Sequence, residues 1–381
     1  MELYGDCHVV VCISVPMTVE TARITKANQE RRGLLPCSLT GTIDPQGAIT
    51  IPSLFLDVTH FGAGNQGTGF TFELICAGTV IIEYAQPAPQ QIVEIKCGLT
   101  NFEFLGCEYT REGNTVAADK FRANLGGVEI TFKHVKDHKK IVSQLEAGHG
   151  VEVTAEAITT AEFSQLSQLE QLVADATILL SYATGTYISW PYRDVYCDGK
   201  LICSNLYAVK TGPYVHRNWV IDADNLQACD MKIFLETSYP TFKSLKTDLG
   251  LDVVLEFLVV ANQGRYFEVT FLLDAVAAEC LLSYLSAYFN KIGKKGDMSS
   301  FRNKMKELLN HFGVVFKEEE LDFIGVRDKI VHTGKFPAEV SPPEATMKLH
   351  NLMDRTVLTM LGYRGKFYLN RANHYVRELL Q

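Results

Sequence analysis

The sequence predicts an α+β protein, with a β-rich N-terminal domain followed by an all-α C-terminal helical bundle. Residues 1–150 alternate short apolar and polar runs between glycine, proline and asparagine, which is the period-two pattern of strands. After about residue 226 the apolar residues recur at helical spacing instead. The 381 residues are also more than one compact domain usually holds, so we expect two or three domains.

The β-rich domain, residues 1–150, is expected to be sandwich- or barrel-like, because short strands alternate with turn residues throughout it. A connector, residues 151–225, follows it. We expect a helix from Ala157 to Ala183 in this connector, and then a β-hairpin. Asp198-Gly199 is a typical two-residue hairpin turn.

The C-terminal domain, residues 226–381, is expected to be a helical bundle. Its most apolar segment runs from Phe267 to Phe289 and predicts a buried central helix. Gly334 predicts a helix end, and Ser341 followed by two prolines and an acid predicts a helix start. The candidate helices span residues 226–236, 239–262, 265–290, 298–312, 318–333, 342–361 and 371–380.

The composition favours a cytoplasmic protein without a membrane segment. Hydrophobic residues make up 47% and charged residues 21%, as in ordinary globular proteins. The first apolar run contains a proline and follows acidic residues, which does not fit a secretory signal. No stretch approaches the roughly 20 apolar residues needed to span a bilayer.

The ten cysteines are scattered and include no C-x-x-C pair. Several lie in apolar, strand-like runs, where free cysteine packs as a small hydrophobic residue. We therefore expect buried, reduced thiols, and no metal or cofactor. The alternative is a zinc site formed by Cys197, Cys203 and His216, but these residues lack the usual paired spacing.

Charge is distributed unevenly along the chain. The net charge of −8 argues against a general nucleic-acid-binding surface. Residues 1–264 carry −11, however, and residues 265–381 carry +3. Any function that involves phosphate groups is therefore expected in the C-terminal domain.

The segment Glu318–Phe336 contains an arginine and a histidine five residues apart, Arg327 and His332. Three acids at its start suit the positive end of a helix dipole, and its apolar residues share one helical face. Side chains five residues apart point about 140° apart around a helix. One helix therefore does not aim both groups at one atom, whereas two copies related by a two-fold axis could.

An arginine and a histidine are suited to cleaving RNA without a metal. RNA carries its own nucleophile, the 2′-hydroxyl group. A histidine can take the proton of that hydroxyl or deliver one to the leaving oxygen, and an arginine can stabilise the charge on the phosphate. The alternative is a solvated Arg327 and a His332 that only hydrogen-bonds carbonyl groups at the helix end.

The chain from about Phe267 onward resembles the HEPN superfamily, and within it the Apea-like HEPN proteins of prokaryotic defence. The resemblance depends on RDKIVHTG, which looks like the R-(polar)-x-x-x-H helix of that family, and on the preceding apolar helix with its acid, Glu279. It covers roughly the last third of the chain. The β-rich region is similar to the variable N-terminal part of such proteins.

Membership would imply a helical bundle that dimerises through its C-terminal helices and acts as an endoribonuclease in antiviral defence or abortive infection. Arg327 and His332 would be catalytic, with Asp328 and Glu279 in support. The β-rich domain would then bind a trigger or regulator. Some HEPN proteins lack nuclease activity, so a non-catalytic module that binds RNA, a nucleotide or a protein is the alternative. A ligand-recognition protein whose helices only dimerise it is a third.

Other residues are weaker candidates. A basic cluster of Lys291, Lys294, Lys295 and Arg302 with Lys304 and Lys306 could bind RNA phosphates or be a solvated face. Aromatic residues of strands usually belong to the core, although they could stack on a ligand. A second basic run is expected to be solvated surface. The aromatic residues are Tyr187, Trp190 and Tyr192, and the second basic run contains Lys133, His134, Lys136, His138, Lys139 and Lys140.

Overall fold

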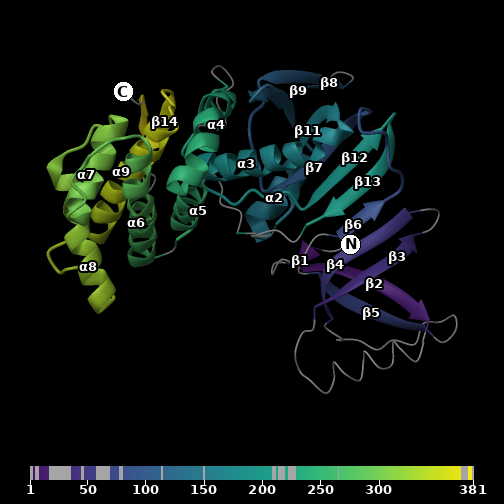
Figure 1. Cartoon of the computed structure of the whole chain (residues 1–381), viewed down its shortest axis with the longest axis horizontal. Coiled ribbons are helices and arrows are strands. Elements are labelled where there is room, and N and C mark those ends of the chain that lie inside the picture. The colour runs from purple at the N-terminus through teal and green to yellow at the C-terminus, as the bar shows by residue number, and fades with distance from the viewer. Residues whose placement is uncertain are drawn as a thin grey trace.

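We analysed a computed structural model of the chain, shown in Figure 1. It describes residues 80–112, 115–148, 151–207, 212, 219–221, 229–264, 266–369 and 376–379, together with the strands that precede residue 80. The α+β prediction is confirmed: an antiparallel sheet is followed by a region that consists mostly of helices. Both parts are visible in Figure 1, with the sheet on the right and the bundle on the left.

Strands β1 to β13 form one hydrogen-bonded antiparallel sheet. Strand β3 (Pro36–Ile43) pairs with β4, beside the main order of the sheet. The main order is β1 (Leu3–Tyr4), β2 (His8–Pro16), β5 (Gly69–Cys76), β4 (Gly47–Leu56), β6 (Val80–Glu83), β13 (Lys200–Leu206), β12 (Tyr192–Cys197), β7 (Ile92–Thr100), β11 (Val153–Glu162), β10 (Val128–His134), β9 (Thr115–Leu125) and β8 (Glu108–Glu112).

The pairing runs from β1 to β8 in a single sheet, and the sandwich- or barrel-like arrangement of residues 1–150 stays a prediction. The sheet also includes the hairpin of the predicted connector. In that hairpin β12 and β13 turn at Asp198-Gly199, and β12 pairs with β7, with Tyr192 opposite Gly98. Local sequence predicts such a turn, but the partner strand lies about 100 residues away and is chosen by tertiary packing.

Helix α3 (Leu166–Thr184) begins later than we predicted. Residues from Ala157 to Glu162 belong to β11, where they pair with β7 and β10. Thr159, Thr160 and Ile158 are β-branched, which favours a strand over a helix. A short helix, α2 (His138–Gly148), connects β10 to β11 and was not predicted. Helix α3 lies between the sheet and the bundle (Figure 1).

The bundle contains most of the predicted helices. Helix α4 continues through Pro240 and stops at Gly250, whose φ of 59° suits glycine, so the predicted break near residue 238 was wrong. The predicted helix 371–380 was also wrong, since β15 (Val376–Leu379) pairs there with β14 (Lys366–Leu369). The helices are α4 (Asp230–Leu249), α5 (Leu251–Asn262), α6 (Phe267–Lys291), α7 (Phe301–Phe312), α8 (Phe323–Thr333) and α9 (Pro342–Met360), with a 3₁₀ turn η2 (Glu318–Asp322) before α8.

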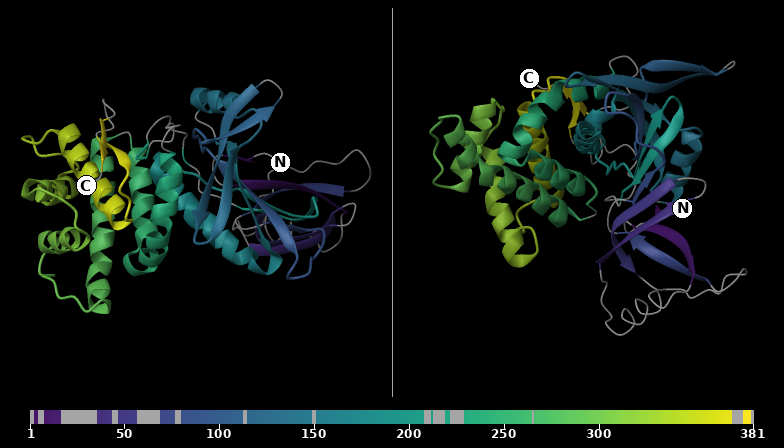
Figure 2. Two further views of the ribbon diagram at one scale, coloured as in Figure 1. Left: turned by 90° about the horizontal axis from the view of Figure 1, so that it is seen from above. Right: turned by 45° about the vertical axis from the view of Figure 1, so that its right-hand side comes forward.

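Helix α6 is the central helix of the bundle, as predicted. It packs against α4, α5, α7, α8 and α9. Both views in Figure 2 show the green helices of the bundle gathered on one side of the sheet. Phe271, Leu281 and Leu285 on α6 are fully buried. By length and composition alone α6 would be able to cross a membrane, contrary to our expectation for the sequence. Its contacts within the bundle are those of a core helix.

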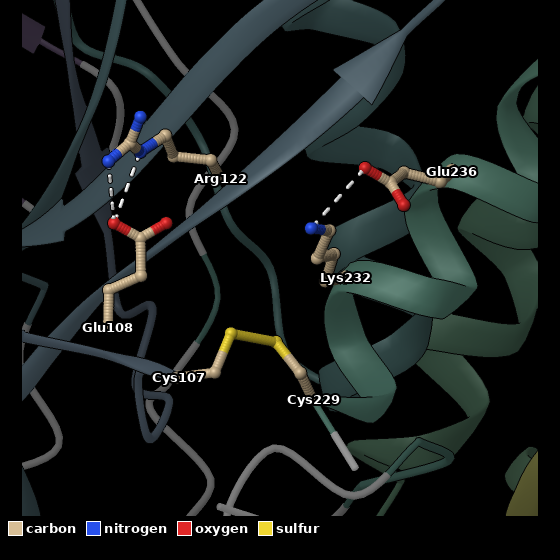
Figure 3. The surroundings of a disulfide bond; sticks show 6 residues. All are labelled: Cys107, Glu108, Arg122, Cys229, Lys232 and Glu236. Atoms are coloured by element: carbon tan, nitrogen blue, oxygen red, sulfur yellow. Dashed lines mark hydrogen bonds and ion pairs between the residues drawn. A yellow bond between two sulfur atoms is a disulfide. The ribbon is translucent and has the colours of Figure 1, made fainter.

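A disulfide bond connects the sheet to the bundle (Figure 3). Cys107, just before β8, is bonded to Cys229, just before α4, across 122 positions of sequence. Nearby, Glu236 of α4 accepts a hydrogen bond from the backbone N–H of Asn124 in β9, at 2.9 Å. Our prediction of reduced thiols was therefore wrong for these two cysteines. Among the residues whose side chains the structure describes, four are free thiols: Cys97, Cys197, Cys203 and Cys280.

The disulfide is expected to stabilise the protein substantially. A covalent link that closes a loop of roughly 100 residues restricts the unfolded chain, which contributes about 2–5 kcal/mol. We expect Cys229→Ser to lower the free energy of unfolding by that amount in urea denaturation without reductant. Cys280→Ser, which removes a free thiol, is the control and should change it by less than about 1 kcal/mol. A Cys229→Ser variant as stable as the wild type would show that the bond contributes nothing.

Candidate functional site

Helix α8 carries the predicted catalytic pair. The segment forms a helix because Phe323 and Ile330 are buried against the bundle while acids precede its first turn. It ends at Gly334, as predicted, where φ is 71° and the glycine N–H donates to the carbonyl of Ile330 at 2.7 Å. The helix therefore includes both Arg327 and His332, about 140° apart around its axis.

Arg327 faces the central helix. Its guanidinium donates one hydrogen bond to Glu279 on α6 and another, of 2.8 Å, to Asp328. These two acids raise the pKa of Arg327, with the hydrogen bond that it donates to Asp328 as the largest cause. The arginine side chain is 32% exposed, so it is held in place yet reachable from solvent. The structure thus brings Arg327 into contact with Asp328 and Glu279, the two acids that the resemblance singled out, and their catalytic role stays a prediction.

His332 lies on an exposed part of the same helix. It is the basic residue of the last turn of α8. Its neighbour Val331 is 57% exposed. Within one chain, Arg327 points toward α6 while His332 points to solvent. A single protomer therefore presents the two groups on different sides of α8.

Two of the four residues in the predicted RNA-binding cluster form ion pairs with acids. Lys291 contacts Asp248 at 2.7 Å, and Arg302 contacts Asp322 at 3.1 Å. Lys294 lies over the ring of Phe289, 4.5 Å from its centre. Lys295 is exposed. Because carboxylates already neutralise two of these four cations, RNA would have to compete with them, and the RNA-binding role stays a prediction.

The histidines of the second basic run are not both on the surface. His134, at the end of β10, is 7% exposed and stacks on His138 of α2, with ring centres 3.9 Å apart. Burial, and then the charge of His138, lowers the pKa of His134 to about 3, so it is neutral. The prediction of a solvated surface was wrong for His134, because the apolar ring of Phe104 also covers it at 4.1 Å.

No group of three potential metal ligands occurs in the part of the chain that the structure describes. Of the alternative zinc ligands, Cys197 and Cys203 are buried thiols on β12 and β13. Burial raises the pKa of Cys203, which disfavours the thiolate that zinc requires. His216 lies outside the described residues.

The three aromatic candidates separate in the structure. Tyr192 packs over Gly98 and donates a hydrogen bond to Glu156 at 3.3 Å, which is a role within the sheet. Tyr187 and Trp190 instead line a cavity between α3 and α5, although both also contact the core. The sequence did not distinguish these roles, because all three aromatic residues lie in the same short, strand-like stretch.

A buried polar cluster in the bundle was not predicted. His350 on α9 lies 3.0 Å from both carboxylate oxygens of Asp274 on α6, and its other ring nitrogen lies 3.5 Å from Asp354. Tyr182 on α3 donates a hydrogen bond of 3.0 Å to Asp354. Both carboxylates are fully buried. The i, i+4 spacing of His350 and Asp354 was the available sequence signal. The cluster connects three helices, and its histidine is only 8% exposed.

Comparison of the chain with models of protein families, with curated proteins and with solved structures found no match.

Proposed function

We propose that the protein is a metal-independent endoribonuclease of the HEPN type. The observation that supports this most is the geometry of α8. Its arginine is held in place by two acids, and its histidine is exposed at the helix end. The surplus of positive charge in residues 265–381 is consistent with a substrate that carries phosphate groups.

In the proposed reaction the RNA supplies the nucleophile. One histidine removes the proton of the 2′-hydroxyl, whose oxygen then forms a bond to the adjacent phosphorus. The bond from phosphorus to the 5′-oxygen breaks, and a second histidine gives that oxygen a proton. Arg327 stabilises the charge that develops on the phosphate. The products are a 2′,3′-cyclic phosphate and a 5′-hydroxyl.

This reaction needs two chains, because Arg327 and His332 diverge on α8. A two-fold axis close to this helix would bring two arginines and two histidines around one phosphate. Exposed apolar side chains support such an interface. Val331 on α8 and Phe267 and Val269 at the start of α6 are all partly or largely exposed. Phe336, just after α8, contacts Phe271, so these residues lie toward the same end of α6.

The proposed setting is the cytoplasm of a prokaryotic cell, where the nuclease would act in antiviral defence by abortive infection and where the Cys107–Cys229 bond would have to withstand cellular thiol reductants. The β-rich domain would bind the trigger or regulator. The second candidate function is a non-catalytic HEPN module that binds RNA, a nucleotide or a protein. The ion pairs of Arg327 with Glu279 and Asp328 favour this alternative, because they engage the guanidinium within the protein and leave less of it for a phosphate.

The nature of the products tests the proposal. Purified full-length protein is expected to cleave total RNA in the presence of EDTA, and the fragments should end in a 2′,3′-cyclic phosphate, because the nucleophile belongs to the RNA. The ends are identified by mass spectrometry of a short RNA oligomer. An oligomer with a 2′-O-methyl group at every ribose is the control and should remain intact. Cleavage that EDTA abolishes and a divalent ion restores would contradict the mechanism.

A further inference from the structure

The disulfide bond between Cys107 and Cys229 is open to solvent in a way that the buried thiols are not. Both of its residues are only partly buried, whereas Cys97, Cys197 and Cys203 are buried. In a cytoplasm, disulfides that form are mostly catalytic or redox-sensing, because thiol reductants open the others. A partly exposed bond is one that such reductants can reach without unfolding of the core.

The surroundings of the bond are polar. Figure 3 shows it beside two charged pairs, Glu108 with Arg122 on the sheet and Lys232 with Glu236 on α4. All four side chains are between 30% and 48% exposed. The bond therefore lies at a hydrated edge of the contact between sheet and bundle, where a charged small thiol can approach it.

The backbone at Cys229 is strained. Its φ of 46° and ψ of 49° lie in the left-handed region, where the Cβ of a residue other than glycine comes too close to the backbone. The covalent bond helps to hold Cys229 in this conformation. Opening the bond lets the residue relax, which favours reduction.

Cys229 also lies at the N-terminus of α4, a helix of 20 residues. The N–H groups and the dipole of a helix start stabilise a thiolate, so the sulfur of Cys229 is the better leaving group of the two. Asp230 in the first turn opposes this effect. Burial, and then the charge of Asp230, raises the pKa of Tyr363, so this carboxylate also faces the bundle. The neighbouring charges pair with one another: Glu108 with Lys120 and Arg122, and Glu236 with Lys232.

The sheet and α4 hold together without the bond. The backbone N–H of Asn124 in β9 donates a hydrogen bond of 2.9 Å to Glu236. Gly126, just after β9, lies against the ring of Tyr239, which is buried on α4. These contacts remain when the bond opens. The bond therefore does not have to stay closed for the protein to stay folded.

We propose that Cys107–Cys229 is a redox-active disulfide, which cellular thiols open and a disulfide oxidant closes while the protein stays folded. In the opening reaction a thiolate of the reductant, such as glutathione, attacks the sulfur of Cys107. The bond between the two protein sulfurs breaks, and Cys229 leaves with the electron pair. A second thiolate attacks the mixed disulfide at the reductant sulfur and releases Cys107. Two reductant thiols thus become one disulfide, and the protein gains two electrons and two protons. This reaction does not depend on RNA cleavage.

The test exposes the full-length protein to mixtures of reduced and oxidised glutathione without denaturant. Thiols are trapped by alkylation and located by peptide mass spectrometry. The pair is expected to be mostly open at the reducing potential of a cytoplasm and mostly closed at the more oxidising potential of the endoplasmic reticulum, whereas structural disulfides resist glutathione. The circular dichroism signal should be the same in both, and Cys97 and Cys203 should stay unalkylated. A bond that stays closed until urea unfolds the protein, or an opening that removes the helical signal, would overturn the proposal.

Two variants test the order of attack. Cys107→Ser leaves Cys229 as a thiol, and Cys229→Ser leaves Cys107. The rate of alkylation by iodoacetamide is measured against pH, with the partly exposed Cys280 of each variant as the reference. The midpoint for Cys229 is expected about one pH unit or more below that for Cys107. Equal or reversed midpoints would overturn the assignment of Cys229 as the leaving group. If either variant does not fold, the glutathione experiment on the unchanged chain still decides whether the bond is redox-active.

Discussion

His332→Ala and Arg327→Ala are each expected to lower RNA cleavage by at least about 100-fold. General acid–base catalysis contributes about 10²–10⁴-fold, and one donor to the developing charge contributes about 10²–10³-fold. Both side chains are partly or fully accessible on α8, so the variants should fold. The measurement is the initial rate on a fluorescent RNA oligomer. It should be accompanied by circular dichroism to confirm the helical content.

Lys329→Ala is the matched control for these two variants. Lys329 is an exposed cation on the same helix, between Arg327 and His332 in sequence. Replacing Lys329 by alanine removes one positive charge. It should lower the rate of RNA cleavage by only a few-fold, because the protein attracts RNA more weakly. If Lys329→Ala reduces the rate as much as His332→Ala does, the effect is one of general charge. Full activity in His332→Ala would refute the catalytic assignment.

The same variants test whether two chains share the site. A dimer of one Arg327→Ala chain and one His332→Ala chain, purified through two different tags, retains one arginine and one histidine. A site that needs one complete pair from two protomers should regain part of the activity that each homodimer lacks. If all four groups are required, activity stays lost, and a dimer of a wild-type chain with a double-variant chain should also be inactive. Full activity of that dimer, or of a monomer identified by light scattering, would exclude a shared site.

The largest effect on stability is expected from His350→Ala. The imidazole lies within hydrogen-bond distance of Asp274 and beside Asp354, and both carboxylates are buried. Breaking a buried charged pair by removing one partner costs about 3–5 kcal/mol, because a buried carboxylate loses a hydrogen-bond partner in the protein interior. We expect this loss in urea denaturation, measured by the tryptophan fluorescence and by the circular dichroism signal together.

Two further variants provide a scale for the stability change expected of His350→Ala. Tyr182→Phe removes a single hydrogen bond to Asp354 and should cost about 1–3 kcal/mol. His332→Ala changes an exposed histidine and should cost less than about 0.5 kcal/mol. If His350→Ala lowers the free energy of unfolding no more than His332→Ala does, the cluster does not stabilise the packing of the helices.

Sequence patterns were most informative where structure depends on neighbours along the chain. The apolar segment from Phe267 to Phe289 became the core helix α6, and Gly334 and the prolines after Ser341 mark helix ends as predicted. Arg327, Asp328 and Glu279 were also selected from the sequence, and the structure places them in contact. Helix spacing and glycine φ angles are local properties, so one sequence suffices to infer them.

Our predictions were wrong where a stretch of sequence fits either a helix or a strand. Residues from Ala157 to Glu162 fit a helix in isolation, but pairing with β7 and β10 makes them a strand. The C-terminal segment around Val376–Leu379 was taken for a helix and is a strand paired with β14. Pro240 suggested a break, yet tertiary packing carries α4 past it to Gly250. In each case contacts distant in sequence outweighed local preference.

The sequence by itself determined the α+β class, the central helix and the arginine–histidine helix, because these depend on periodicity and residue type. Only the tertiary structure decided which distant residues meet. It joined Cys107 to Cys229, gathered Asp274, His350 and Asp354, and placed Trp190 opposite the acids of α5. The contacts of Cys107 with Cys229 and of Asp274 with His350 span 122 and 76 positions of sequence. Their physical cause is the burial of apolar surface by whole elements, which brings together side chains that no local pattern pairs.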